Sequence, residues 1–145
     1  MGARAAPGLS VSKAISAALL QHSPATAARW IAEMPATQSA GTAFKPIFEN
    51  WLDRDAPAAA QWIEALPASR RRDEATAAFA TAAASRDVES AAHWVPTIAD
   101  QTLRQNAAER VFRAMDARDP AAARSWLRTV ADLDEQWLER TLKPR

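Results

Sequence analysis

Apolar residues recur along this chain at the spacing of one helix face, and the same arrangement returns four times. In the second copy, Ala59, Trp62, Ile63 and Leu66 stand at positions i, i+3, i+4 and i+7, as in an amphipathic α-helix. The other copies are Ala27, Trp30, Ile31 and Met34; Ala91, Trp94, Val95 and Ile98; and Ala123, Trp126, Leu127 and Val130. The tryptophans of successive copies are 32 residues apart, and a fixed period of this size predicts a repeat architecture.

We call the segments that carry these sets the A helices. A second helical pattern, the B helix, follows the A helix in the first three units. Its apolar positions also align at the 32-residue period: Ala43, Ala75 and Ala107; Ile47, Phe79 and Val111; Trp51, Ala83 and Met115. Val11, Ile15 and Leu19 continue this register backwards. Residues 9–22 are therefore interpreted as a leading B helix whose own A helix is missing.

Polar residues mark where the helices begin and end. Ser23, Asp55, Asp87 and Asp119 precede the four A helices, where a side-chain oxygen can accept a hydrogen bond from an unpaired backbone N–H. The B helices end at Arg54, Arg86 and Arg118, whose charge suits the negative end of the helix dipole and can pair with the neighbouring aspartate. Two prolines interrupt the pattern. Pro46 predicts either a B helix that starts late, near 43–45, or a kink, and Pro96 predicts a short or bent third A helix.

These patterns predict one all-α domain over residues 1–145 with about nine helices in antiparallel pairs. The leading B helix covers 9–22, full repeats cover 23–54, 55–86 and 87–118, and 119–143 hold a last A helix and a capping helix. In the capping helix, the apolar residues Leu133, Trp137, Leu138 and Leu142 lie in a shifted register. Stacked pairs of this kind favour a right-handed α-solenoid. We expect the Trp row to be buried in its core, rather than to form an aromatic binding ladder.

Composition narrows the function classes. Lys plus Arg is 18 and Asp plus Glu is 17, so the net charge of +1 argues against a dedicated nucleic-acid binder. There are no cysteines, which excludes disulfides and thiolate sites. No apolar run approaches the roughly 20 residues of a membrane helix. No signal peptide is recognised at the N-terminus. A cytoplasmic location is favoured, and a periplasmic one stays open if the chain is a fragment.

The sequence offers little support for catalysis. His22 and His93 are the only histidines, and their spacing is not that of metal ligands. The three glycines form no phosphate-binding loop. No carboxylate pair falls in a local motif for general acid and base catalysis. We therefore expect a protein that is not an enzyme and that has no cofactor or metal.

The unit Ala56–Pro67 and the segment Asp119–Leu127 resemble short bacterial helical repeats of the form Asp-Pro-x-x-Ala-x-x-Trp-Leu-x-x-Leu-Pro. These belong to the tetratricopeptide- and HEAT-like group of α-solenoids. The resemblance implies a binding scaffold. The match to true tetratricopeptide units is partial, because the chain has no tyrosine and the Trp stands in a different local phrase. No position matches a peptide-carboxylate clamp.

Positions that vary between copies predict the solvent face. On the A helices they form a polar strip, which is the best candidate for a ligand groove: Arg29, Glu33, Gln61, Glu64, His93 and Arg128. The B helices offer a patchier strip of two rows: Lys45, Ala77 and Glu109; and Glu49, Thr81 and Arg113. Ordinary solvent surface is the alternative interpretation of both strips. Arg70, Arg71 and Arg72 form a candidate basic patch for phosphate or an acidic peptide, although a solvated loop is more common and Asp73 and Glu74 offset part of the charge.

Three functional hypotheses follow. The first is a non-catalytic scaffold that binds a protein or peptide in a groove lined by the A helices. The second is a self-assembling structural fragment of a longer array, which associates through the exposed ends of the solenoid. The third is binding of single-stranded nucleic acid by helical repeats.

Overall fold

The structure is a computed structural model that describes residues 23–33, 41–130 and 133–143. Within these residues the chain is helical and contains no strand, so the expected all-α class is confirmed there. Seven α-helices and one short 3-10 helix are present in this part: α2 (Pro24–Ala32), α3 (Gly41–Ala65), α4 (Arg70–Ala83), α5 (Val88–Trp94), η1 (Val95–Thr97), α6 (Gln101–Asp116), α7 (Pro120–Thr129) and α8 (Glu135–Leu142). The helix expected over 9–22 lies outside the described residues.

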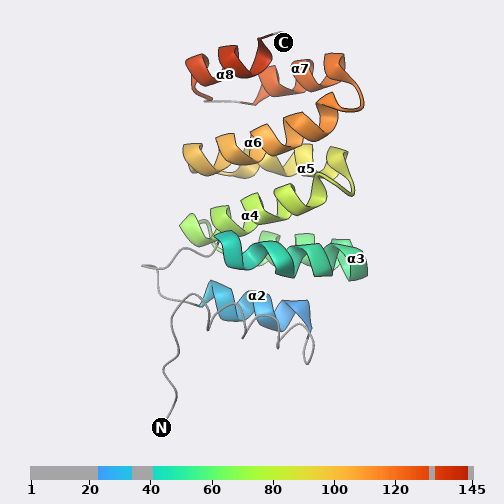
Figure 1. The fold of residues 1–145 in the computed structure, drawn as a ribbon. Helices are drawn as coiled ribbons and strands as arrows, with labels where there is room; N and C mark the ends of the chain where they lie inside the picture. Colours follow the sequence, from blue (N-terminus) through green and yellow to red (C-terminus); the bar gives the residue numbers. More distant parts are fainter. Residues whose placement is uncertain (1–22, 34–40, 131–132, 144–145) are drawn as a thin grey trace.

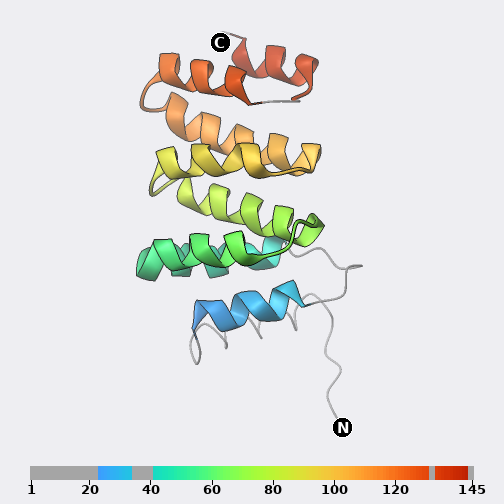
Figure 2. The ribbon, with the colours of Figure 1, turned by 180° about the vertical axis from the view of Figure 1, so that it is seen from behind.

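The long element α3 is two helices joined by a sharp bend. Asp55 has non-helical dihedrals, with φ −161° and ψ 81°. The ring centroids of Phe44 and Trp62 are 6.1 Å apart, whereas two residues 18 positions apart would be separated by about 27 Å along a straight helix. The second half therefore folds back along the first (Figure 2). Asp55 begins the second half as its N-cap, because its Oδ1 accepts a hydrogen bond from Ala58 N at 3.2 Å.

The helices stack along one axis in two layers. In Figure 1 the first half of α3, α4 and α6 lie in front and run in one direction, while the second half of α3 and α5 return behind them. Figure 2 brings this second layer forward, with α2 at its lower end. The surface over the first half of α3, α4, α6 and α8 is called the B face. The A face lies over α2, the second half of α3, α5 and α7.

The core lies between the two layers. The aligned small and branched residues of the A helices are fully buried or nearly so: Ala27, Ala59, Ala91 and Ala123; Ile31, Ile63, Val95 and Leu127. Ile47, Phe79 and Val111 from the B helices meet them with 2% exposure or less. Alanine leaves little space between helix axes, and α4 packs directly along α6. The apolar stripes expected from the 32-residue period therefore form the core of the described part.

The Trp row departs from the expectation of burial. Trp30 is 49% exposed, and Trp62, Trp94 and Trp126 are half-buried at the margin of the core. Trp62 and Trp94 each pack against the preceding B helix. The ring centroids are 6.2 Å apart for Trp62 and Phe48, and 5.5 Å apart for Trp94 and Phe79. An indole is too large to fit between closely packed alanines, so it covers the edge of the interface instead. The neighbouring branched residues take the fully buried positions.

The four predicted A-helix caps are confirmed. Ser23, Asp55, Asp87 and Asp119 each accept a hydrogen bond from the backbone N–H three residues further on, at 3.1 to 3.3 Å.

The two prolines inside the helical pattern have different effects. The late helix start or kink expected at Pro46 is not found: α3 begins at Gly41, continues through Pro46, and has its non-helical residue at Asp55. Pro96 lies in η1, so the third A helix is short, as expected.

The arginines at the ends of the B helices were expected to pair with the neighbouring aspartates. For Arg86 this expectation is wrong, because it does not pair with Asp87. Its Nε donates to Asp53 Oδ1 at 2.8 Å and its Nη2 to Asp53 Oδ2 at 3.3 Å. A third bond runs from Arg86 Nη1 to the carbonyl oxygen of Ala82 at 3.0 Å, which satisfies an end carbonyl of α4. The pair joins two successive B helices, because the fork of the guanidinium reaches a carboxylate one repeat earlier.

Candidate functional site

A hollow of about 390 Å³ opens on the B face between α3, α4 and α6. Its floor is made of small apolar side chains, because α4 and α6 present alanines where they approach each other. Polar and charged side chains stand around this floor. The lining residues are Lys45, Glu74, Ala77, Ala78, Thr81, Leu103, Asn106, Ala107 and Arg110.

Two further hollows continue from the first along the same face. The second lies on α6 and shares Asn106 and Arg110 with the first. The third lies between α6 and α8, with a volume of about 330 Å³, and shares Glu109 and Arg113 with the second. Because neighbouring hollows share lining residues, they adjoin. We call the three together the B-face channel.

Cations outnumber carboxylates along the B-face channel. Lys45 and Arg110 are exposed, and neither has an ion-pair partner among the described residues. The full set of lining charges is Lys45, Arg110, Arg113, Arg140 and Lys143 against Glu74, Glu109 and Asp116. Two of the three carboxylates are already engaged. Glu109 pairs with Arg113 at 2.8 Å, and Glu74 pairs with Arg71 at 3.3 Å. The remaining field favours an anion.

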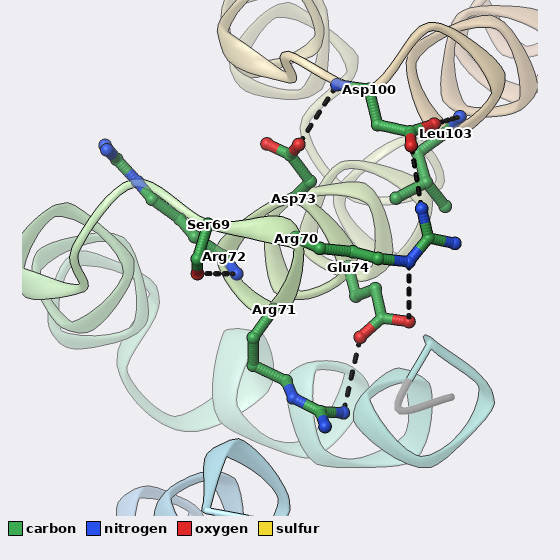
Figure 3. A network of polar contacts seen from close by, with 8 residues as sticks. All are labelled: Ser69, Arg70, Arg71, Arg72, Asp73, Glu74, Asp100 and Leu103. Carbon is green, nitrogen blue, oxygen red and sulfur yellow. Dashed lines mark hydrogen bonds and ion pairs between the residues drawn. The ribbon is translucent and has the colours of Figure 1, made fainter. Parts of the chain in front are cut away.

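The predicted basic patch turns out to be mostly engaged in local contacts (Figure 3). Arg70 Nη1 donates to Asp100 Oδ2 at 2.7 Å, and Arg71 Nη1 donates to Glu74 Oε1 at 3.3 Å. Arg71 is largely covered, with 15% of its side chain exposed. Arg72 is half-buried, and its backbone N–H donates to the hydroxyl of Ser69 at 3.1 Å to start α4. The triplet begins α4 and links it to Asp100, the residue before α6.

A clamp on the loop after η1 completes this network. The two carboxylate oxygens of Asp73 accept hydrogen bonds from Ala99 N at 3.1 Å and Asp100 N at 3.0 Å. Arg104 Nη1 donates to the carbonyl oxygens of Ile98 and Ala99 at 2.8 and 3.1 Å. Both side chains are buried. The loop is thus held through its donors from α4 and through its acceptors from α6, which sets the distance between the helices that line the first hollow.

The same device returns one repeat later. Gln105 stands 32 residues after Asp73, and its Oε1 accepts from the backbone N–H of Asp134 at 3.3 Å. Asp134 caps α8 as Asp100 caps α6, through bonds to Trp137 N at 2.7 Å and Leu103 N at 2.9 Å. The two caps are 34 rather than 32 residues apart, which is the register shift expected for the last helix.

Among the residues that the structure describes, the pKa values of Asp53 and Asp100 are shifted. The hydrogen bond from the Arg86 guanidinium lowers the pKa of Asp53, and the same bond raises the pKa of Arg86. The backbone N–H of Leu103 lowers the pKa of Asp100, and the charge of Arg70 adds to this effect. In each case the bond is made to the charged form and stabilises it. Both groups are structural partners at helix ends and stay ionised at neutral pH.

The structure places the predicted A-helix strip on the surface but not around the hollows of the B face. Its six members are all exposed: Arg29, Glu33, Gln61, Glu64, His93 and Arg128. Of these, Arg128 lines a hollow of about 600 Å³ between α7 and α8, which shares Arg140 and Lys143 with the third hollow of the B-face channel. The B-face channel takes in Lys45, Ala77, Thr81, Glu109 and Arg113 from the second predicted strip.

Sequence reasoning did not single out Asn106 and Arg110. Both lie on α6, and Arg110 follows Glu109 of the predicted B strip directly. Their signal is a change of residue type between copies. Arg110 corresponds to Ala78 one repeat earlier, and Asn106 to Glu74. Extending the comparison of copies to every B-helix position would have found them.

No family model, curated protein or solved structure matches this chain. Among residues 23–33, 41–130 and 133–143, no group of three or more His, Cys, Asp or Glu side chains is arranged to hold a metal ion. No helix in the same part combines the length and apolar character needed to cross a membrane.

Proposed function

We propose that this protein is a non-catalytic α-solenoid scaffold that binds an extended segment of another protein. The observation that carries the proposal is the B-face channel, whose hollows continue from α3 across α4 and α6 to α8. A row of hollows along successive helices offers several separate contacts to an elongated ligand, which suits a peptide better than a compact small molecule.

The shape of the channel supports this choice. Its first hollow is open to solvent and is lined by alanines together with polar side chains. Small-molecule sites are usually deeper and enclose most of the ligand. A peptide needs only pockets for alternate side chains and polar groups for its backbone, and Thr81 and Asn106 supply such groups.

The A-helix strip remains a competing surface for the same function. Arg29, Glu64 and Arg128 are exposed on it and would meet a partner from the other side of the molecule. A self-assembling array is a second candidate, favoured by Trp30, which exposes 49% of its surface on α2. Nucleic-acid binding is the third, and the net charge of +1 weighs against it.

The test is a selection of random displayed peptides on the purified chain, followed by fluorescence anisotropy with the enriched sequences. We expect a recurrent sequence pattern that binds with a micromolar dissociation constant. No enrichment over uncoated beads would contradict the scaffold function. Analytical ultracentrifugation of the same sample tests the second candidate, because concentration-dependent oligomers without peptide binding would favour self-assembly.

The selected peptides also distinguish the two faces. One variant reverses two charges on the B face, Lys45→Glu and Arg110→Glu. Its matched control reverses two on the A face, Arg29→Glu and Arg128→Glu. All four side chains are exposed, so both variants should fold. Loss of binding in the first alone assigns the function to the B face, and loss in the second alone assigns it to the A face.

A further inference from the structure

We infer that the B-face channel recognises an acidic peptide, in which carboxylates flank small or branched apolar side chains. This inference deepens the proposed scaffold function and rests on it. It adds the chemical class of the ligand and the residues that recognise the ligand.

The first step is the balance of charge at the channel. Lys45 on α3 and Arg110 on α6 stand on the rim of the same hollow, and neither is paired with a carboxylate of the described residues. Arg140 and Lys143 of α8 continue the cationic rim at the far end. A carboxylate brought between two unpaired cations gains from both, and it displaces no existing ion pair.

The second step concerns the negative charge of Glu74 in the first hollow. Glu74 is the acidic residue of the first hollow, with 6% of its side chain exposed, and it contacts Arg70 at 4.0 Å and Arg71 at 3.3 Å. Neither arginine lines this hollow, and their positive charges offset the negative charge of Glu74. Lys45 and Arg110 therefore dominate the potential over the alanine floor.

The third step is the floor itself. Ala77, Ala78 and Ala107 leave space beside Leu103 for a small or branched apolar side chain. Burial of such a side chain adds a term that does not depend on salt. The ligand therefore combines an apolar side chain for the floor with carboxylates for Lys45 and Arg110.

The same observations favour a peptide over single-stranded RNA. The first two hollows contain no aromatic side chain on which a base could stack, and the two aromatic residues of the third, Phe112 and Trp137, line it together with Glu109 and Asp116. Glu109 and Asp116 line the channel further along and would repel a continuous run of phosphates. Separate carboxylates on a peptide can avoid these positions.

The test uses three fluorescein-labelled probes: a decapeptide that alternates Asp or Glu with Ala or Leu, the same peptide with Asn and Gln in place of the acids, and decauridylate. Anisotropy should show binding of the acidic peptide, and at least about tenfold weaker binding of the amide peptide. The affinity for the acidic peptide should fall as NaCl rises from about 50 to about 500 mM. Tighter binding of decauridylate would overturn the proposal in favour of RNA.

Two variants assign the site. The charge reversal Lys45→Glu with Arg110→Glu should weaken the acidic peptide about tenfold or more. The charge reversal Arg29→Glu with Arg54→Glu, at two exposed residues that line none of the three hollows, should leave it unchanged. Ala77→Phe fills the floor without a change of charge and should weaken both the acidic and the amide peptide. Equal loss in the two charge-reversal variants would mean that net charge alone is responsible, which refutes the site. Circular dichroism verifies the helical fold of each variant.

Failure of this inference is distinct from failure of the proposed function. If the displayed library yields neutral or basic peptides, or peptides that are lost only with the A-face variant, the scaffold function stands and the acidic ligand is refuted. If neither the library nor the acidic probe binds, both are refuted.

Discussion

Asp73 accepts two backbone hydrogen bonds from a loop 26 and 27 residues further along the chain. The carboxylate therefore satisfies main-chain N–H groups of the loop that precedes α6. It is buried at 9% exposure, so water cannot easily replace it. The residue thus connects the start of α4 to the start of α6 without adding apolar surface.

Removal of this carboxylate should destabilise the fold. We expect Asp73→Ala to lower the free energy of unfolding by about 1–3 kcal/mol, because two backbone N–H groups lose their partner. Asp73→Asn keeps one acceptor and should cost less. Urea denaturation followed by circular dichroism measures both. Glu64→Ala on the exposed A face is the control and should stay within about 0.5 kcal/mol of the wild type. Equal stability of Asp73→Ala and the wild type would show that the clamp is not needed.

The lowered pKa values of Asp53 and Asp100 predict how stability changes with pH. A carboxyl whose pKa is lower in the folded state stabilises the fold above its unfolded pKa of about 3.9, and this contribution is lost as the pH falls through the folded pKa. We therefore expect the free energy of unfolding to decrease below about pH 4. The variant Asp53→Asn with Asp100→Asn should show a flatter dependence between about pH 7 and pH 3 in urea titrations. An identical slope in both proteins would exclude these two groups as the cause.

At the level of the element, Asp55 decides whether α3 is one helix or two. Its extended φ and its side-chain bond to Ala58 N start a new helix at the point where the B helix ends. Asp55→Ala removes the cap and should cost about 0.5–2 kcal/mol, whereas Asp55→Ser retains a side-chain acceptor and should recover most of it. Thermal unfolding of the three proteins compares them. Full stability of Asp55→Ala would mean that packing alone holds the bend.

The positions of the helices follow from local rules, which explains why they were predictable. Apolar period, capping residues and prolines act within one or two turns, and the same four caps were expected and observed. What the repeat pattern could not supply is how deeply a given side chain sits. Trp62 and Trp94 share an apolar stripe with Ile63 and Val95, yet only the smaller residues are fully buried. This difference depends on the spacing between helices that are distant in sequence.

The candidate site was harder to predict for the same reason. The A-helix strip was chosen because its residues vary between copies, and its members are indeed exposed. A hollow, however, forms where small side chains of neighbouring helices face each other, as Ala77 and Ala78 of α4 and Ala107 of α6 do. The direct packing of α4 along α6, with alanines between Lys45 and Arg110, is a property of neighbours in space. Likewise, the partner of Arg86 proved to be Asp53, because a long side chain reaches past its sequence neighbour.

Across the whole molecule, the protection of the backbone should fall from the middle of the stack to α8. Most of α4 is buried, while α8 has no buried residue and is tied by the bond from Arg124 Nη1 to the carbonyl oxygen of Leu142 and by the cap at Asp134. Local opening costs less where little apolar surface must be exposed.

Native-state hydrogen exchange, read by mass spectrometry of peptides, should therefore show α8 exchanging well before α4. Arg124→Ala removes the side-chain tie and should speed exchange in α8 without changing α4, whereas Ser125→Ala, at an exposed neighbour, should change neither. Because nearest neighbours supply most of the stability in a stack of helix pairs, loss of one contact at the end should not spread to the middle. Equal protection of the two helices would mean that the described part unfolds as one cooperative unit, and the solenoid interpretation would then lose its energetic basis.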